Sequence, residues 1–317
     1  MGAYIARRLL GLIPLLLLIS FAVFALVLAV PGDPARTIAG GLDASETRVT
    51  EIRDELGLDD PILQQYARWL GGVLSGDLGT SLFNGRTVAS ELAARFPVTL
   101  SLALGAIVFA AAVGIPLGLL AGTRPGSLLD RGLSVGTSLG IALPDFFLAT
   151  AMVVLFAVKR NLLPAIGYVD IAENPVAWAQ HLIMPWIALG VATAASLARQ
   201  VRGSMIEVLD ADYIRTARAK GLAERRVMGR HALKNALIPV VTALGILMGQ
   251  LLGGSVVVET VFDWPGLGRL MLISVLNKDF TVVQGTILFV VVIFVTINLL
   301  TDALYAFLDP RVRYTDH

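Results

Sequence analysis

The sequence predicts an all-α membrane protein with six transmembrane helices, and three observations lead to this fold class. Hydrophobic residues make up 56% of the 317 residues and charged residues only 15%, whereas soluble domains carry about 25% charged residues. Six apolar runs are candidates for spanning a bilayer, since a spanning helix needs about 20 apolar residues to cross about 30 Å of hydrocarbon. The third observation is that Lys and Arg are distributed unevenly among the loops that join these runs.

The first apolar run follows Arg7 and Arg8, as the core of a secretory signal would. Its uncharged stretch is longer than the roughly 7–15 residues of a signal core, so we expect a retained anchor. Asp145 interrupts the third run, and the fourth run is the shortest. The six predicted helices are Leu9–Val30, Val98–Thr123, Gly132–Val158, Leu182–Ala198, Asn235–Val258 and Phe280–Thr301.

The placement of basic residues orients these helices. With the N-terminus inside, 15 of the 25 Lys and Arg residues fall on the inner side, nine of them between Arg199 and Lys234. Six of the ten outer basic residues lie in the segment Pro31–Pro97, which is long enough to weaken the positive-inside rule locally. The short loops therefore decide the orientation, and both termini are predicted to be cytoplasmic.

The long outer segment is predicted to form a small helical subdomain. Asp43 starts a D-x-x-E pattern and Gly57 provides a stop, so Glu46–Leu56 is a predicted helix. Asp60 is then expected to cap a second helix with Pro61 at its first position. The subdomain is either a platform for an extracytoplasmic receptor or a solvated spacer, because its ten acidic residues fit both.

The densest charge of the chain lies in the cytoplasmic loop, where Tyr213–Asn235 contains seven Lys or Arg and one Glu. Orientation alone needs fewer charges, and the loop lacks the Gly, Ser and Pro content of a tether. Acidic residues precede the stretch Ala211–Lys220, basic residues close it, and Gly221 follows it. This order of charges and caps predicts a short helix over that stretch.

Three apolar side chains of that short helix share one face: Tyr213, Ile214 and Ala217. The patch is about one turn long and too small to fold alone. It must pack either on the rest of this protein or on a partner whose groove has an acidic rim.

This loop resembles the coupling loop, or EAA loop, of ATP-binding-cassette (ABC) importer permeases. Gly221 occupies the motif glycine, but Arg215, Thr216 and Ala217 stand at the Glu-Ala-Ala positions and Lys234 stands where proline is usual. The string "ADYIRTARAKGL…RHALKNALIPVVTALG" is similar to the version found in dipeptide and oligopeptide permeases, which pair with a second, non-identical permease.

Four further blocks carry the same resemblance in the order expected of that family. They are "PGDPA" (Pro31–Ala35), "LGLDDPILQQYARWLGGVLSGDLGTS" (Leu56–Ser81), "VVETVFDWPGLGRLM" (Val257–Met271) and "LLTDALYAFLDPRVRY" (Leu299–Tyr314). Together they extend the resemblance to peptide permeases over nearly the whole chain.

The resemblance implies a type I ABC importer permease fold in the plasma membrane of a bacterium or archaeon. It implies a second, homologous permease as a heterodimer partner, two ATPase subunits or one fused ATPase, an extracytoplasmic substrate-binding protein and membrane lipid, with no nucleic acid. No cofactor is expected on this chain, because ATP would be bound by the partner ATPase subunits. The residues implied in coupling to the ATPase are Asp212, Tyr213, Ile214, Arg215, Thr216, Ala217, Arg218, Ala219, Lys220 and Gly221.

The predicted domain order follows from these assignments. Residues 1–30 form the N-terminal segment with the first helix, 31–97 the outer subdomain and 309–317 a cytoplasmic tail. Residues 98–308 form the permease core, which contains the coupling loop 199–234.

Glycines recur every four residues in the third and fifth predicted helices. Such stripes let helix backbones approach closely within lipid, where packing drives association, although glycine is common in membrane helices in any case. We expect tight helix contacts at Gly132, Gly136, Gly140, Gly245, Gly249 and Gly253, within the chain or against the partner permease.

Asp145, which follows Pro144 in the third run, is the strongest candidate for a residue in the substrate path. Ionisable groups within the bilayer are costly and therefore candidates for function. The carboxylate would meet a cationic group such as a peptide amine, or it would pair internally or be protonated at a helix break. Gln250 in the fifth helix is a weaker candidate for the same path.

Absent motifs exclude several other functions. The sequence has no G-x-x-x-x-G-K-[ST] phosphate loop, so the chain is not expected to be the ATPase or any enzyme. With no Cys and only three His, catalytic or structural metal sites are not expected. An intramembrane enzyme or an ion-gradient transporter remains a remote alternative, as neither H-E-x-x-H nor inverted repeats are found. Nickel chelates and glutathione remain open as substrates beside peptides.

Overall fold

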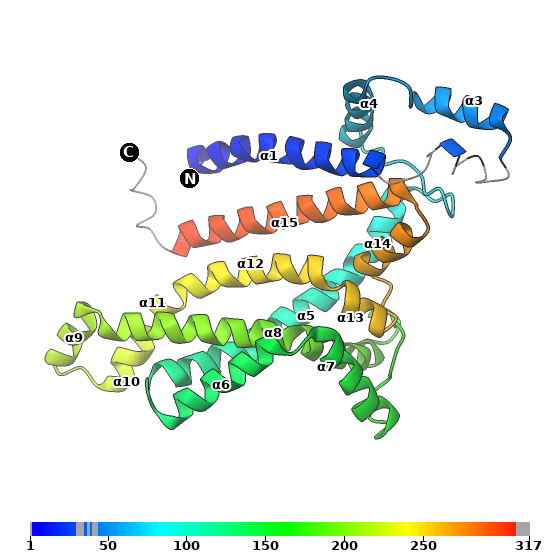
Figure 1. Ribbon diagram of the computed structural model, residues 1–317. Coiled ribbons are helices and arrows are strands. Elements are labelled where there is room, and N and C mark those ends of the chain that lie inside the picture. The colour runs from blue at the N-terminus through cyan, green and yellow to red at the C-terminus, as the bar shows by residue number, and fades with distance from the viewer. Residues whose placement is uncertain (1, 30–34, 37–38, 40–43, 309–317) are drawn as a thin grey trace. The chain divides into compact units, whose positions relative to one another are not determined.

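The computed structural model describes residues 2–29, 35–36, 39 and 44–308 (Figure 1). The predicted N-cap Asp43, most of the block Pro31–Ala35 and the tail 309–317 lie outside the described residues. Regular structure in the described part is helical, and a bridge joins Thr80 to Thr87. Its longer helices are α1 (Gly2–Ala29), α3 (Glu46–Leu56), α4 (Ile62–Leu74), α5 (Val88–Gly122), α6 (Leu128–Ala142), α7 (Asp145–Met152), α8 (Pro175–Asp210), α9 (Asp212–Ala219), α12 (Ile238–Gly254), α13 (Val256–Val261), α14 (Leu267–Leu276) and α15 (Phe280–Leu308).

Three of these helices, α5, α8 and α15, are each long and apolar enough to cross a membrane, and two bent helix pairs raise the number to five. The fourth predicted segment, the shortest in the sequence, is the core of α8, which has 36 residues. Hydropathy marked only Leu182–Ala198, because the helix continues through the charged residues that lead to Asp210.

The third predicted segment is a broken helix and not a continuous one. α6 ends at Ala142 and α7 starts at Asp145, and the two axes differ by 92°. Leu143 is extended, with ψ 120°, as expected for a residue that precedes a proline, and Pro144 caps α7. Asp145 therefore lies in the first turn of α7 and not in the middle of a helix.

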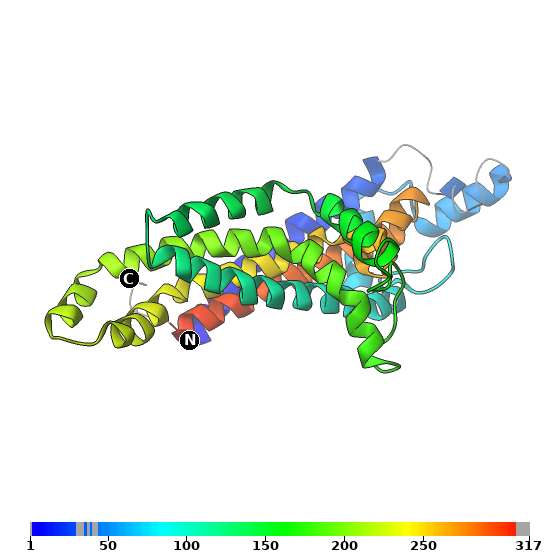
Figure 2. The ribbon, with the colours of Figure 1, turned by 90° about the horizontal axis from the view of Figure 1, so that it is seen from below.

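The chain divides into two compact units, of which the larger comprises residues 96–269 and 293–317. Within it, α6 and α7 pack against α8, and so does α12 (Figure 2). The main cluster of buried side chains joins α5, α7, α8, α12 and α13 around Leu102, Leu182 and Trp264. This helical core places the loop that follows α8.

Close backbone packing joins α5 to α8 within that unit. A Cβ atom added at Gly114 or Gly118 would come within 2.6 Å and 2.5 Å of the carbonyl oxygens of Ala194 and Ala198. One added at Gly122 would lie 2.7 Å from Met205 Cβ. These three glycines repeat every four residues, so α5 presents a smooth face along which α8 lies.

The smaller unit comprises residues 1–95 and 270–292. Glu46–Leu56 is a helix as predicted, and Gly57 ends it with φ 59°. Its N-cap is Ser45, whose side chain accepts a hydrogen bond from Arg48 N. The prediction for Asp60 is wrong: α4 starts at Ile62 without a side-chain cap, since the Asp60 carboxylate pairs with Arg68.

Candidate functional site: the loop around α9

Helix α9 forms the predicted short helix of the loop, and it runs over Asp212–Ala219 directly after α8. Ala211 is extended and separates the two helices. Asp212 lies in the first turn and Arg218 in the last, which is the charge order that a helix dipole favours. Gly221 follows with φ 74°, a backbone conformation that suits glycine and ends the helix.

Two of the three apolar residues predicted for the docking patch face the protein itself. Ile214 is fully buried and Ala217 is 8% exposed. Both pack in a cluster with Met205 from α8 and with Val227 and Ala236 beyond α9. Of the two alternatives, packing on this protein or on a partner, these two side chains therefore follow the first. Tyr213, the third member, is 44% exposed.

The opposite face of α9 is free to meet another molecule. Since successive helical residues turn by about 100°, the residues opposite Ile214 and Ala217 are Asp212, Arg215, Thr216 and Ala219, and all four are exposed.

Ion pairs fix the flank of this surface. Arg218 binds Glu224 through two hydrogen bonds, of 2.7 Å and 3.2 Å. This pairing raises the pKa of the Arg218 guanidinium above its usual value. Lys220 and Gly221 are exposed at the end of the helix. The Tyr213 hydroxyl accepts a 3.0 Å hydrogen bond from Asn235, which ties α9 to the start of the next membrane segment.

The residues predicted for the substrate path lie apart from this loop. Asp145 is half-buried at the helix break, and among the described residues its side chain has no hydrogen bond and no ion pair. Gln250 is exposed on α12. No hydrogen bond within the described part joins these two residues.

The predicted glycine stripes divide into packed and open positions. A Cβ at Gly140 would lie 3.1 Å from Ala195 Cβ, and Gly245 and Gly249 are covered by Thr301 and Phe294 of α15. Gly132, Gly136 and Gly253 have nothing within 4 Å of an added Cβ. The stripe Gly114, Gly118 and Gly122, which makes closer contacts than these, was not predicted, although its four-residue spacing is readable in the sequence.

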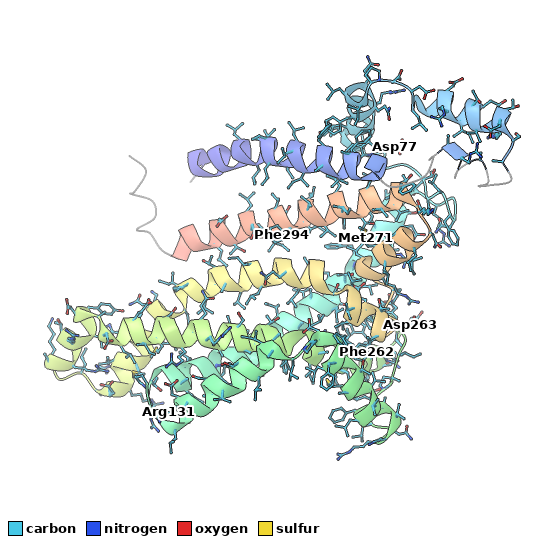
Figure 3. All side chains as sticks on the ribbon, viewed as in Figure 1. Asp77, Arg131, Phe262, Asp263, Met271 and Phe294 are labelled. Atoms are coloured by element: carbon cyan, nitrogen blue, oxygen red, sulfur yellow. The ribbon has the colours of Figure 1, made fainter. Side chains whose placement is uncertain are left out.

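The sequence reasoning also missed a buried carboxylate. Glu259 is fully buried in the first turn of α13 and has no basic partner among the described ion pairs. Its Oε1 accepts hydrogen bonds from Thr99 (2.8 Å) and Ser255 (2.7 Å), and its Oε2 accepts one from Arg269 N (2.9 Å). It thus links α5 to the start of α14. Phe262 and Asp263, which are labelled in Figure 3, lie between α13 and α14. The sequence did contain an indication of this site, namely a glutamate within the apolar block that continues the fifth predicted helix.

Several helices long and apolar enough to cross a bilayer place the protein in the class of multi-pass membrane proteins. Sequence comparison assigns the family: residues 1–103 match the N-terminal model of binding-protein-dependent transport system membrane components, and residues 114–314 match the "Binding-protein-dependent transport system inner membrane component" model. The chain belongs to this family of inner-membrane permeases.

Individual relatives cover the whole chain. One is a protein of Brucella abortus (strain 2308) that is named as a permease of a peptide transport system, 44% identical over 99% of this chain and 100% of its own length. Another is the glutathione transport system permease GsiC of Escherichia coli (strain K12), 44% identical over 98% of this chain and 99% of its own length.

A solved structure shares the fold. It is a chain of the methionine ABC transporter MetNI in an inward-facing conformation, with a TM-score of 0.57 and 23% identity over 69% of this chain and 96% of the other. The ABC importer permease fold predicted by resemblance is thereby confirmed, whereas the six-helix count and the location of the termini remain predictions.

Proposed function

We propose that this chain is one of two non-identical permeases of an ATP-driven importer for dipeptides or oligopeptides. Its partners in this proposal are the second permease, two ATPase subunits or one fused ATPase, and an extracytoplasmic receptor. The family assignment supports the importer class, and the relatives named for peptide transport support the substrate class. The chain itself then binds no ATP.

The exposed face of α9 is the surface that we propose for the ATPase. Ile214 and Ala217 pack the helix against its own chain. A partner would therefore contact the exposed residues Asp212, Arg215, Thr216 and Ala219. This face carries the small residue Ala219 beside Thr216 and the Asp212–Arg215 ion pair, which suits insertion into a narrow groove with polar walls. Burial of the Ile214 and Ala217 face is the observation that carries the proposal, because it fixes which face of α9 is exposed to a partner.

The test replaces Ala219 with Trp in the complete transporter reconstituted in proteoliposomes. The large side chain projects from the exposed face, so it should block the ATPase groove without disturbing the buried cluster. We expect loss of ATPase binding and of uptake, while Ala219→Ser, the matched control, should transport normally. Normal ATPase binding and uptake by Ala219→Trp would show that this face of α9 is not the docking surface.

The topology belongs to the same proposal, with six crossings and both termini in the cytoplasm. The chain has no Cys, so single cysteines can be introduced without background. A cysteine at Thr216 should react with an impermeant maleimide only in inside-out vesicles. Labelling in right-side-out vesicles would place α9 on the outer side and refute both the orientation and the coupling role.

Asp145 is proposed as a contact for the substrate's amino group. Its support is position and lack of a partner: a half-buried carboxylate at a 92° helix break, with no internal ion pair in the described chain. Uptake by Asp145→Asn of peptides with free and with acetylated N-termini tests it. A selective loss for free amines is expected, and unchanged uptake of both kinds would remove Asp145 from the path.

Glutathione is the second candidate substrate, because GsiC is as similar to this chain as the peptide-named relative is. Competition by unlabelled glutathione against a labelled dipeptide, with the cognate receptor present, separates the two. Complete inhibition at low concentration would favour glutathione, and its absence would favour other peptides.

A further inference from the structure

A groove runs between α5, α6 and α8 inside the larger unit. It has a volume of about 280 Å³ and is lined by apolar side chains, among them Phe109, Val113, Leu117, Leu133 and Val191. This volume is close to the lower end of the range of ligand sites, about 300–1,000 Å³. The open position Gly136 also lines the groove, and the absence of a side chain there contributes to its width.

A small recess of about 10 Å³ with mostly apolar walls adjoins the groove toward the α9 end of α8. The two share Leu117, Leu133 and Thr137 as walls, and the recess adds Arg199 and Arg202. One end of the combined site is therefore apolar and the other end is cationic.

One of the two guanidinium groups at the cationic end has no ion-pair partner among the described residues. Arg202 donates to both oxygens of Asp130, with Nη2 2.8 Å from Oδ2, so this pair is internally neutralised and fastens α6 to α8. Arg199 is exposed and has no ion pair or hydrogen bond among the described residues. Arg131, in the first turn of α6 (Figure 3), lies near enough to Asp130 to interact with it electrostatically but lines neither cavity.

The length of the site matches one leaflet of a bilayer. Val191 and Arg199 are both in α8, and at 1.5 Å per residue they are about 12 Å apart along the axis. The long Arg199 side chain extends this reach toward the membrane surface. Half of a hydrocarbon core of about 30 Å is about 15 Å. The cationic end therefore falls at the membrane surface when the apolar end lies near the bilayer centre.

We propose that this groove is a binding site for an anionic phospholipid of the leaflet on the α9 side. One acyl chain lies along Phe109, Val113 and Val191, and the phosphate group pairs with Arg199. An apolar channel of one leaflet's length that ends in an unpaired guanidinium matches a lipid in both shape and charge. A helix of the partner permease is the competing occupant, and it would bring no phosphate to Arg199.

The experiment uses the whole transporter, purified in mild detergent and placed in nanodiscs of phosphatidylcholine with a minor share of phosphatidylglycerol. Lipids that remain bound are counted by native mass spectrometry. The wild type should retain phosphatidylglycerol, and Arg199→Gln should weaken its preference over phosphatidylcholine about fivefold, the usual effect of one basic residue at a membrane surface. Arg199→Lys should restore the preference.

Two glycine variants separate the groove from the rest of α6. Gly136→Leu should fill the groove and displace the retained lipid, while Gly132→Leu, on the same stripe but outside the groove, should not. Equal lipid retention by wild type, Gly136→Leu and Arg199→Gln would overturn the proposal. So would crosslinking of a Gly136→Cys chain to the partner permease, which would show that a protein helix occupies the groove. Neither outcome depends on which substrate is transported.

Discussion

Replacing Ile214 by Ala tests whether α9 depends on its own chain for its position. The side chain is fully buried in the cluster with Met205 and Val227. Each buried methylene or methyl group contributes about 0.8 kcal/mol, so removing three of them weakens the packing of α9 by about 2.4 kcal/mol. Local opening of the helix should then increase about 50-fold.

Hydrogen exchange of the peptide that contains α9 measures this opening directly, because exchange of its amides requires the helix to detach. Thr216→Ala is the matched control, since Thr216 lies on the exposed face and only its backbone contact to Asp212 is lost. ATP-driven uptake should fall in Ile214→Ala, whereas Thr216→Ala serves as the control for exchange alone, because Thr216 belongs to the proposed docking face. If exchange in Ile214→Ala is unchanged, the buried cluster does not hold α9; if exchange rises while uptake persists, a fixed direction of α9 is not required for coupling.

Three further substitutions test the packing described above. Gly118→Ala should destabilise the protein by about 1–3 kcal/mol in thermal unfolding, because its Cβ would collide with the α8 backbone; Gly132→Ala should not, and equal stability would refute the close approach. Glu259→Gln replaces one carboxylate oxygen by an NH2 group, which cannot accept from Arg269 N or from the hydroxyls of Thr99 and Ser255, and should cost about 1–3 kcal/mol; an unchanged melting temperature would contradict the buried network. Ser81→Ala removes a donor to Asp279 and an acceptor for two loop amides, so amides 79–87 should exchange faster; unchanged exchange would show that Ser81 does not organise the loop.

Features set by neighbouring residues were predictable from the sequence. The helix Glu46–Leu56 and the helix α9 were located within a residue at each end, because Gly57 and Gly221 take the positive φ that ends them. The direction of α9 was not predictable. Its apolar stripe fitted both the protein and a partner, and only the position of Met205 and Val227 decides between them.

Features that depend on distant partners were missed or misjudged. Asp60 has the residue type of an N-cap, but Arg68 competes for its carboxylate. Gly132–Val158 was predicted as one helix, and local rules do not give the 92° break at Pro144. Hydropathy underestimated α8 because the method detects the thickness of the bilayer and not the length of a helix. Glu259 was overlooked because the donor that joins it to α5, Thr99, lies 160 residues away in the sequence.

The length of α8 has a consequence for how this family can vary. With 36 residues it is about 54 Å long, well beyond the about 30 Å of a hydrocarbon core, and only the extended residue Ala211 separates it from α9. One residue inserted between Met205 and Asp210 would turn α9 by about 100° and aim its exposed face away from any partner. Seven inserted residues would restore its direction to within about 20° but would displace it by about 10 Å. Insertions and deletions should therefore be rare in this stretch of α8, even where substitutions are frequent.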